Sequence, residues 1–178
     1  AGKSVAVFEA SDRVGGRVAT DEVDGFLLDR GFQIYLTAYP EASAVFDHTA
    51  LQLRAFEPGS IVKTTAGFSR LSDPWRRPSR LLSTAFAKVG GFSDRIRIGV
   101  LRWLASRGNV SDAFSHPDKS TSEELRRLGF SDKMMTEFLR PFLGGVFLDA
   151  DLQTSCRMLY FVFRMFSQGD AVLPVRGM

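Results

Sequence analysis

Cysteine and histidine are scarce in this chain of 178 residues, which holds one cysteine and two histidines. A single cysteine excludes an internal disulfide and a cysteine-based metal cage. Cys156 falls in a helical pattern of apolar residues, so we expect a buried and unreactive thiol. Neither His48 nor His116 has a histidine, cysteine or acid at metal-ligand spacing. We therefore expect no metal site and assign neither histidine a catalytic role.

Long apolar runs, repeats and low-complexity segments are also missing from the sequence. No stretch approaches the roughly 20 apolar residues that a helix needs to span a bilayer. Tyrosine contributes 3 residues and tryptophan 2, whereas phenylalanine contributes 16. Because phenylalanine has no polar group, this bias suits an ordinary core or a cavity for an apolar ligand, and we favour the core.

The most informative feature that is present lies near the N-terminus. Apolar residues that end in a carboxylate, Glu9, predict a buried parallel strand over residues 4–9. A carboxylate at the end of such a strand can accept hydrogen bonds from a ribose diol. The following Gly15-Gly16-Arg17 combines glycines that allow close backbone approach with a guanidinium that can bind a diphosphate. Glu9 and Arg17 could instead be ordinary surface charges, but their spacing favours half of an adenine-dinucleotide site.

The other half of such a site is missing. In a Rossmann-type unit a G-x-G-x-x-G turn precedes the acidic residue by about 20 positions, and only eight residues precede Glu9. We therefore expect this chain to be an internal piece of a longer protein. We also expect the isolated chain to bind a dinucleotide poorly, because the first diphosphate loop is not in it.

Residues 7–17 (VFEASDRVGGR) and 24–33 (DGFLLDRGFQ) resemble the FAD-dependent amine oxidase superfamily. That superfamily includes monoamine oxidases, protoporphyrinogen oxidases and phytoene desaturases. Residues 138–149, 161–166 and 173–178 are similar to its desaturase-like branch. The resemblance is tight over residues 4–40 and looser over 138–178. It implies FAD as the cofactor and hydride transfer from a substrate carbon to flavin N5.

The resemblance also implies roles for individual residues. The cofactor-binding set comprises Glu9 at the adenosine ribose, Ala10 and Arg13 beside it, Gly15, Gly16 and Arg17 at the pyrophosphate, and Arg30, Gly31, Phe32 and Gln33 along the flavin ring. No catalytic residue follows from the resemblance, because we expect the segment that completes the flavin site in this family to lie outside the chain.

Two β-hairpins are predicted from turn signals. Residues 17–22 and 26–29 flank Asp24-Gly25, and residues 61–65 and 68–71 flank Ala66-Gly67.

Helices are predicted from capping and breaking residues. Pro40 is expected to open one helix, and the pattern becomes helical again from about residue 78. Four later helices are predicted. The first is capped by Ser93 and ends at Gly108, and the second begins with a Thr121-x-x-Glu124 capping box. The third begins at Ser131 and stops at Pro141, and the last, deeply buried, is capped by Thr154 or Ser155 and runs to about Ser167.

The predicted fold class is therefore α/β. We expect a partial Rossmann-like FAD-binding corner over residues 1–36. A mostly helical region with a β-hairpin, similar to the substrate domain of the family, should occupy residues 37–178.

The net charge of the chain is +3, but the charged residues are distributed unevenly along the sequence. Residues 70–107 hold nine basic and two acidic side chains, a local charge of +7. Within them, residues 75–80 (WRRPSR) are interpreted first as a solvated loop and second as a peripheral membrane contact. Nucleic acid is a disfavoured partner. The compartment stays open, with cytoplasmic and membrane-peripheral locations both compatible with the sequence.

Three functions are compared at this stage. The first is an FAD-dependent oxidoreductase acting on a small, apolar substrate. The second is a flavin-dependent sugar-nucleotide mutase, which would need a polar, arginine-lined pocket. The third is a non-catalytic basic module that binds nucleic acid or an anionic membrane.

Overall fold

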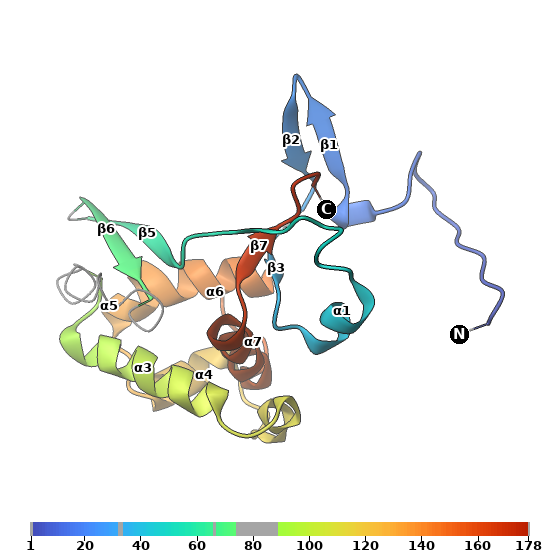
Figure 1. Cartoon of the computed structure of the whole chain (residues 1–178). Coiled ribbons are helices and arrows are strands. Elements are labelled where there is room, and N and C mark those ends of the chain that lie inside the picture. Colours follow the sequence, from blue (N-terminus) through green and yellow to red (C-terminus); the bar gives the residue numbers. More distant parts are fainter. Residues whose placement is uncertain (1, 32–33, 66, 74–88, 178) are drawn as a thin grey trace. The chain divides into compact units, whose positions relative to one another are not determined.

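The computed structural model describes residues 2–31, 34–65, 67–73 and 89–177. Contacts divide the chain into a first unit, Ala1–Phe56 with Ala171–Met178, and a second unit, Glu57–Asp170 (Figure 1). The division at residue 36 into cofactor-binding and substrate-binding parts stays a prediction. The predicted contact at residues 75–80 and the first helical residues after 78 lie outside the described ranges.

The first unit contains the predicted N-terminal hairpin. A short 3-10 turn, η1 (Gly16–Val18), leads into β1 (Thr20–Val23), which pairs antiparallel with β2 (Phe26–Asp29). Asp24 and Gly25 join the strands with φ angles of 50° and 80°. Such angles are typical of the two-residue turn that an Asp-Gly pair favours, so this hairpin is confirmed.

A three-stranded sheet ties the end of the chain to the first unit. Its strands are β3 (Tyr35–Leu36), β4 (Arg54–Ala55) and β7 (Ala171–Leu173), and both β3 and β4 pair antiparallel with the central β7. Helix α1 (Pro40–Val45) begins at Pro40 as predicted. The sheet makes residues 171–177 structural neighbours of the cofactor-like sequence near the N-terminus.

The predicted parallel strand at residues 4–9 is corrected by the structure. Residues 2–9 are exposed and adopt no regular secondary structure, and the side chains of Val5, Val7 and Phe8 are 77–93% exposed. A strand needs backbone partners on at least one side, and no described strand pairs with this segment. The mixture of helix and sheet agrees with the α/β class, whereas the Rossmann-like corner stays a prediction.

The second unit is mostly helical. The predicted hairpin is present as β5 (Gly59–Thr64) and β6 (Gly67–Ser72), but Gly67 pairs with Thr64 as part of β6 and does not belong to the turn as predicted. The helical segments that follow are α3 (Phe92–Ser106), η3 (Val110–Ser115), α4 (Thr121–Arg127), α5 (Asp132–Met134), η4 (Met135–Leu139), α6 (Arg140–Phe147) and α7 (Cys156–Gln168).

Two predicted helix starts are shifted. Helix α3 is capped at Gly91, whose N–H donates to the Asp94 carboxylate at 2.7 Å, and not at Ser93. The capping box of α4 is formed by Ser120 and Glu123, one position before the predicted pair. This shift leaves Glu124 on the inner side of the helix, where it takes a different role. The predicted caps at Ser131 and Ser155 are confirmed.

The predicted helix stop at Pro141 is wrong. The chain passes through η4, a π-helical turn, directly into α6, where Pro141 occupies one of the first positions. Proline is tolerated at the start of a helix because its missing N–H has no required partner there. The π turn before it already interrupts the regular backbone hydrogen bonds of the α-helix, so the missing N–H of Pro141 is tolerated.

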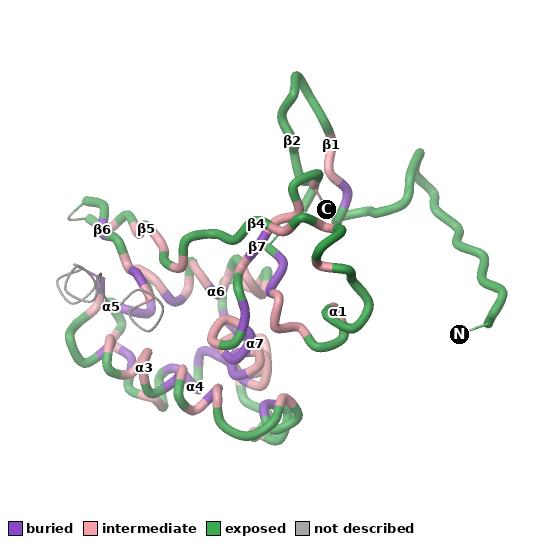
Figure 2. Tube along the Cα trace, in the orientation of Figure 1, coloured by how far each residue is buried: buried purple, intermediate pink, exposed green. Residues whose placement is uncertain are grey.

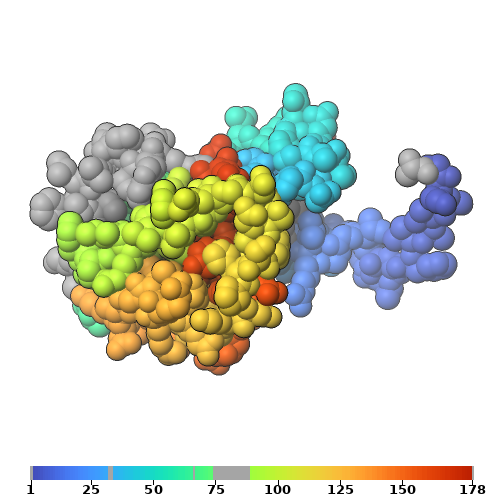
Figure 3. Space-filling view, turned by 90° about the horizontal axis from the view of Figure 1, so that it is seen from below, coloured from blue at the N-terminus to red at the C-terminus, as the bar shows by residue number. Residues whose placement is uncertain are grey.

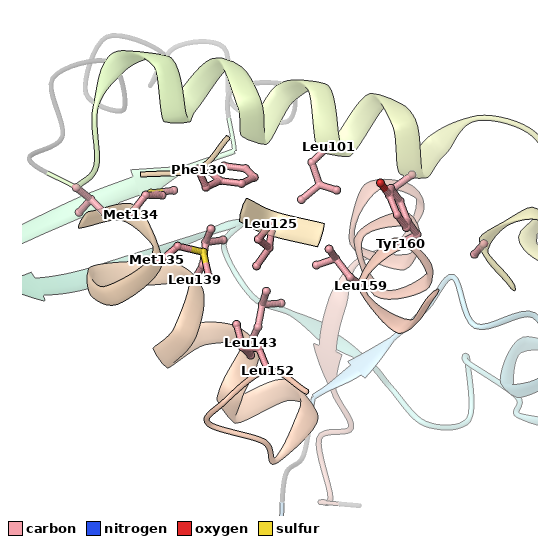
Figure 4. Close-up of a cluster of buried hydrophobic side chains, with 13 residues drawn as sticks. Leu101, Leu125, Phe130, Met134, Met135, Leu139, Leu143, Leu152, Leu159 and Tyr160 are labelled. Atoms are coloured by element: carbon pink, nitrogen blue, oxygen red, sulfur yellow. The ribbon is translucent and has the colours of Figure 1, made fainter. Parts of the chain in front are cut away.

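The core of the second unit lies between α3, α4, α6 and α7 (Figure 4). Its buried apolar residues are Val89, Leu101, Ala105, Ala113, Leu125, Phe130, Met134, Met135, Leu139, Leu143, Leu152, Leu159 and Tyr160. Cys156 is buried nearby, as predicted. Helix α7 buries one side and leaves other positions half-buried, so it is less enclosed than its apolar sequence predicts.

Candidate functional site

The Gly15-Gly16 turn exposes open backbone on the Gly16 side. Both residues have φ in the left-handed region, at 120° and 51°, where side chains other than glycine are strained. A Cβ at Gly16 would meet no atom within 4 Å, while one at Gly15 would lie 3.3 Å from the Cβ of Ala19. The space beside Gly16 is therefore open to a ligand that needs close backbone approach.

Glu9 presents a carboxylate that is partly engaged. Its Oε1 accepts hydrogen bonds from the N–H and the hydroxyl of Ser11, both at 2.8 Å. The backbone bond from Ser11 lowers the pKa of Glu9 below its ordinary value, so the group is ionised at neutral pH. Neither of these two hydrogen bonds involves Oε2, the second oxygen of the carboxylate. An ionised oxygen of this kind can accept the hydroxyls of a ribose, and the adjacent Ala10 is exposed.

Asp21 on β1 joins two of the predicted cofactor-binding arginines. Arg30 donates from Nε and Nη2 at 2.7 and 3.0 Å, and Arg13 donates to the same carboxylate. The hydrogen bond from Arg30 is the main reason why the pKa of Asp21 is lowered, and the same bond raises the pKa of Arg30. Asp21 thus holds two guanidinium groups at the foot of the hairpin.

Sequence reasoning missed Asp21, although a signal was available. Residues that pair across a hairpin are fixed by its turn, and Asp21 stands opposite Leu28, two positions from Arg30. A carboxylate on one strand with an arginine just beyond the other is a candidate ion pair. We assign Asp21 to the site as a positioning residue.

The returning strand of the hairpin brings Gly31 against Arg17. The N–H of Arg30 donates to the carbonyl of Ala19 at 3.0 Å, and a Cβ on Gly31 would lie 2.7 Å from the carbonyl oxygen of Arg17. Only glycine therefore fits at this position with the backbone as it stands. Phe32 and Gln33 lie outside the described residues.

The C-terminal segment reaches the same hairpin. A Cβ on Gly177 would lie 2.6 Å from Oγ1 of Thr20, which itself donates to Asp29 at 2.5 Å. Strand β7 carries residues 174–177 to this place. Gly177, in the family-like run that begins at residue 173, thus lies against β1, between the two family-like runs of the N-terminal region, which sequence reasoning did not foresee.

The two histidines have ordinary structural partners. Nε2 of His48 lies 2.7 Å from the Tyr35 hydroxyl, and the His116 ring stacks on Tyr160 at 3.8 Å between centroids. Within the described part of the chain, no group of three or more His, Cys, Asp or Glu side chains is placed to hold a metal ion. In the same residues, no helix combines the length and apolar character required to cross a bilayer.

A polar cluster of buried Glu124 and Tyr160 with exposed Arg127 joins α4 to α7 in the second unit. Glu124 accepts two hydrogen bonds from Arg127, at 2.6 and 2.7 Å, and one from the Tyr160 hydroxyl at 2.5 Å. These donors, Arg127 first, lower the pKa of Glu124 to about 2. Burial raises the pKa of Tyr160 well above its ordinary range. The cluster is internally satisfied, so we interpret it as structural.

Comparisons with known proteins address the sequence as a whole. A family model described as flavin containing amine oxidoreductase matches residues 1–178. Protoporphyrinogen oxidase 2, chloroplastic/mitochondrial, of Arabidopsis thaliana is 27% identical over 146 residues, which cover 81% of this chain and 28% of that protein. Coproporphyrinogen III oxidase of Propionibacterium freudenreichii subsp. freudenreichii is 26% identical over 158 residues, covering 82% and 28%. The resemblance seen in the sequence and FAD as its cofactor are thereby confirmed. The matched region spans little more than a quarter of each relative.

Proposed function

We propose, because this chain belongs to the family of flavin-containing amine oxidoreductases, that it supplies part of the FAD site and part of the substrate side of an oxidoreductase. When bound, FAD supplies the acceptor for a hydride that leaves a substrate carbon. The observation that carries the proposal is the run from Glu9 to Arg17, which lies inside the family match and contains the open Gly15-Gly16 turn.

We propose that the adenine half of the cofactor is bound by Glu9, Gly16 and Arg17. The ionised Glu9 binds Ser11 through Oε1, and its Oε2 can accept the ribose hydroxyls. The open side of Gly16 lets the diphosphate approach the backbone, and Arg17 supplies a positive charge beside it. Gly15 gives the turn its left-handed geometry, and Ala10 flanks the ribose.

Arg13 and Arg30 are proposed to act as a pair held by Asp21. Because both guanidinium groups bind one carboxylate, their positions are fixed relative to the turn at residues 15–17. Arg30 leads into Gly31, Phe32 and Gln33, the residues that we propose to pass the flavin ring. Gly31 contributes because, without a side chain, its own backbone can lie directly against the Arg17 backbone.

We propose a porphyrinogen as the substrate class. Both relatives carry names of porphyrinogen oxidases, and each match covers more than four fifths of this chain. The tetrapyrrole ring of a porphyrinogen is apolar, although it carries propionate carboxylates, and the ring agrees with the apolar substrate expected from a sequence with 16 phenylalanines.

The mutase alternative has less support. A sugar nucleotide needs arginines that are free to bind phosphate. In the second unit the buried Arg164 donates instead to the backbone carbonyls of Ala105, Arg107 and Gly108. Both Nη atoms of that arginine are thus used to close the end of α3. The alternative of a basic binding module predicts salt-sensitive retention on DNA, and its absence at low salt would remove that alternative.

Cofactor retention by the complete protein tests the proposal. We expect Glu9→Gln with Arg17→Ala to weaken FAD binding at least about tenfold, because a ribose acceptor and a diphosphate donor are both lost. The matched controls are Glu22→Gln on β1 and Arg54→Ala on β4. Both residues are exposed in the first unit and lie outside the run from Glu9 to Arg17. Undiminished flavin in the double variant would refute the proposed site.

The substrate class needs a separate assay. The flavin-loaded protein should oxidise protoporphyrinogen or coproporphyrinogen and should not isomerise a nucleotide sugar. Turnover of the sugar alone would favour the mutase and leave the FAD site intact.

A further inference from the structure

Glu137 carries a buried carboxylate oxygen that the protein does not satisfy. Its Oε2 is buried, and none of the described residues forms a hydrogen bond with it. The glutamate as a whole is half-buried, so its carboxyl group lies just below the surface. A buried polar atom without a hydrogen bond is costly, and a folded protein that keeps one calls for an explanation.

A local ion pair does not explain the buried oxygen. Lys133 precedes Glu137 by four residues and Arg140 follows it by three, which are the spacings at which side chains pair on a helix. Neither cation donates to Oε2 in the described structure. The carboxylate therefore keeps an acceptor available although two cations lie close to it along the chain.

The π turn adds a second acceptor beside Glu137. Glu137 is the central residue of η4, where the N–H of Arg140 donates to the carbonyl of Met135. In a regular α-helix that N–H would donate to the carbonyl of Thr136 instead. The next residue, Pro141, has no N–H, so the helix supplies neither of the usual donors to the Thr136 carbonyl. Single π turns of this kind are frequent at functional sites.

Three phenylalanines lie next to the π turn. The rings of Phe138 and Phe142 stack with their centroids 5.4 Å apart, and the Phe142 ring lies 5.7 Å from that of Phe166 on α7. All three are half-buried, so part of each ring stays accessible. The segment around residues 130–140, orange in Figure 3, forms part of the surface shown in that view. Apolar rings beside unsatisfied acceptors suit a ligand that combines apolar groups with N–H donors.

We infer that Glu137 is a substrate-binding residue, whose buried oxygen accepts hydrogen bonds from the pyrrole N–H groups of a porphyrinogen. Each pyrrole of a porphyrinogen carries an N–H donor inside an otherwise apolar ring system. The Thr136 carbonyl is placed to accept a neighbouring N–H, and the phenylalanines offer contact to the ring faces. This inference rests on the proposed function, from which it takes the substrate class.

Other ligands fit these residues less well. A polyene has no N–H donor, so it would leave both Oε2 of Glu137 and the Thr136 carbonyl unpaired. A sugar nucleotide would bring phosphate charges close to a carboxylate, which repels them. A porphyrinogen meets the acceptors and the phenylalanines together.

Glu137→Met in the complete, flavin-loaded protein tests the inference. Methionine has a similar length but no carboxylate oxygen to accept a pyrrole N–H. We expect the KM for coproporphyrinogen to rise at least about tenfold, with a much smaller change in kcat, because this contact holds the substrate before and during the reaction. Anaerobic titration of the protein with its flavin reduced, which prevents turnover, should show the same loss as a higher Kd.

Glu137→Gln should give a smaller loss of about two- to fivefold, since the amide keeps one acceptor oxygen. Asp132→Asn is the matched control. Asp132 is exposed on α5, shortly before η4, so the change removes the same charge nearby and should leave KM within about twofold. FAD affinity should be unchanged in all three variants, because the proposed cofactor residues belong to the first unit.

The thermal midpoint separates binding from structure. Because Oε2 has no partner to lose, Glu137→Met should melt at the same temperature as the unmodified protein or higher. A clear fall in the midpoint, or an unchanged KM and Kd for coproporphyrinogen, would assign Glu137 a structural role and overturn the inference. Failure of the proposed function would look different, since the unmodified protein would then oxidise no porphyrinogen, and both conclusions would fall.

Discussion

The two units of this chain are stabilised in different ways. The second unit encloses a cluster of thirteen buried apolar residues, whereas the described part of the first unit buries Ala19, Tyr35, Leu36 and Val172 as its apolar residues. Figure 2 shows the contrast, with buried segments concentrated in the helices of the second unit. The first unit is stabilised instead by strand pairing, by tight turns and by the ion pairs of Asp21.

This contrast separates folding from binding. The predicted cofactor-binding residues belong to the first unit, where backbone and charged groups remain accessible. Six of the ten leucines that the structure describes in the second unit are buried in the core. Substitutions in the core of the second unit should therefore change stability, and substitutions in the first should change FAD affinity. The four predictions that follow test that division, from the largest expected effect to the smallest.

Leu159→Ala should produce the largest change. Leu159 is fully buried on α7, and truncation leaves a cavity that costs about 2–5 kcal/mol of unfolding free energy. Urea unfolding measures the effect. Leu27→Ala on β2, where the leucine is 47% exposed, is the control and should change stability by less than about 0.5 kcal/mol. Similar losses of unfolding free energy in both variants would show that the two units are not stabilised differently.

Glu124→Gln should cost about 1–3 kcal/mol at neutral pH, because Arg127 and Tyr160 lose a charged acceptor. The pKa of Glu124 is about 2 in the folded protein and ordinarily 4.5. Its stabilisation is therefore present above the ordinary value and is lost as pH falls towards 2. Urea titrations at different pH should show a steeper acid loss in the unmodified protein than in the variant. Equal slopes would mean that the cluster contributes no pH-dependent stability.

Gly31→Ala should weaken FAD binding about tenfold in the complete protein. Its Cβ would meet the Arg17 carbonyl oxygen at 2.7 Å, so the backbone beside the diphosphate must shift. Gly145→Ala is the control, because a Cβ there meets no atom within 4 Å and α6 gains a better helix former. Flavin titration provides the measurement, and an unaltered affinity in Gly31→Ala would place the cofactor away from Arg17.

Asp21→Asn should have the smallest effect, a loss of FAD affinity of about threefold, because Arg13 and Arg30 lose the carboxylate that positions them. The conservative variant Asp21→Glu should restore part of the affinity. The thermal midpoint should stay close to that of the unmodified protein, since this ion pair is exposed. Tighter binding in Asp21→Asn would instead show that Asp21 competes with the cofactor for the arginines.

Local features of the fold could be predicted from the sequence. The Asp24-Gly25 turn, the start of α1 at Pro40 and the caps at Ser131 and Ser155 each depend on a few neighbouring residues. Their physical causes are backbone angles and hydrogen bonds within one turn. Such signals are complete in a short stretch of sequence.

Features that depend on distant residues could not be predicted in the same way. Strand β7 pairs with β3 and β4 although it lies at the other end of the chain. Residues 4–9 have a strand-like pattern, but a pattern cannot show whether a partner strand is present. Asp21 comes close to Arg30 only through the pairing of β1 with β2. Pro141 was mistaken for a stop because a π turn leaves no simple sequence signal.

An experimental structure of the complete protein with FAD tests the central claim most directly. We predict that the Glu9 carboxylate lies within hydrogen-bond distance, about 2.6–3.0 Å, of the ribose hydroxyls, and that the diphosphate passes the open side of Gly16. A cofactor whose ribose and diphosphate contact neither Glu9 nor the turn at residues 15–17 would contradict the account.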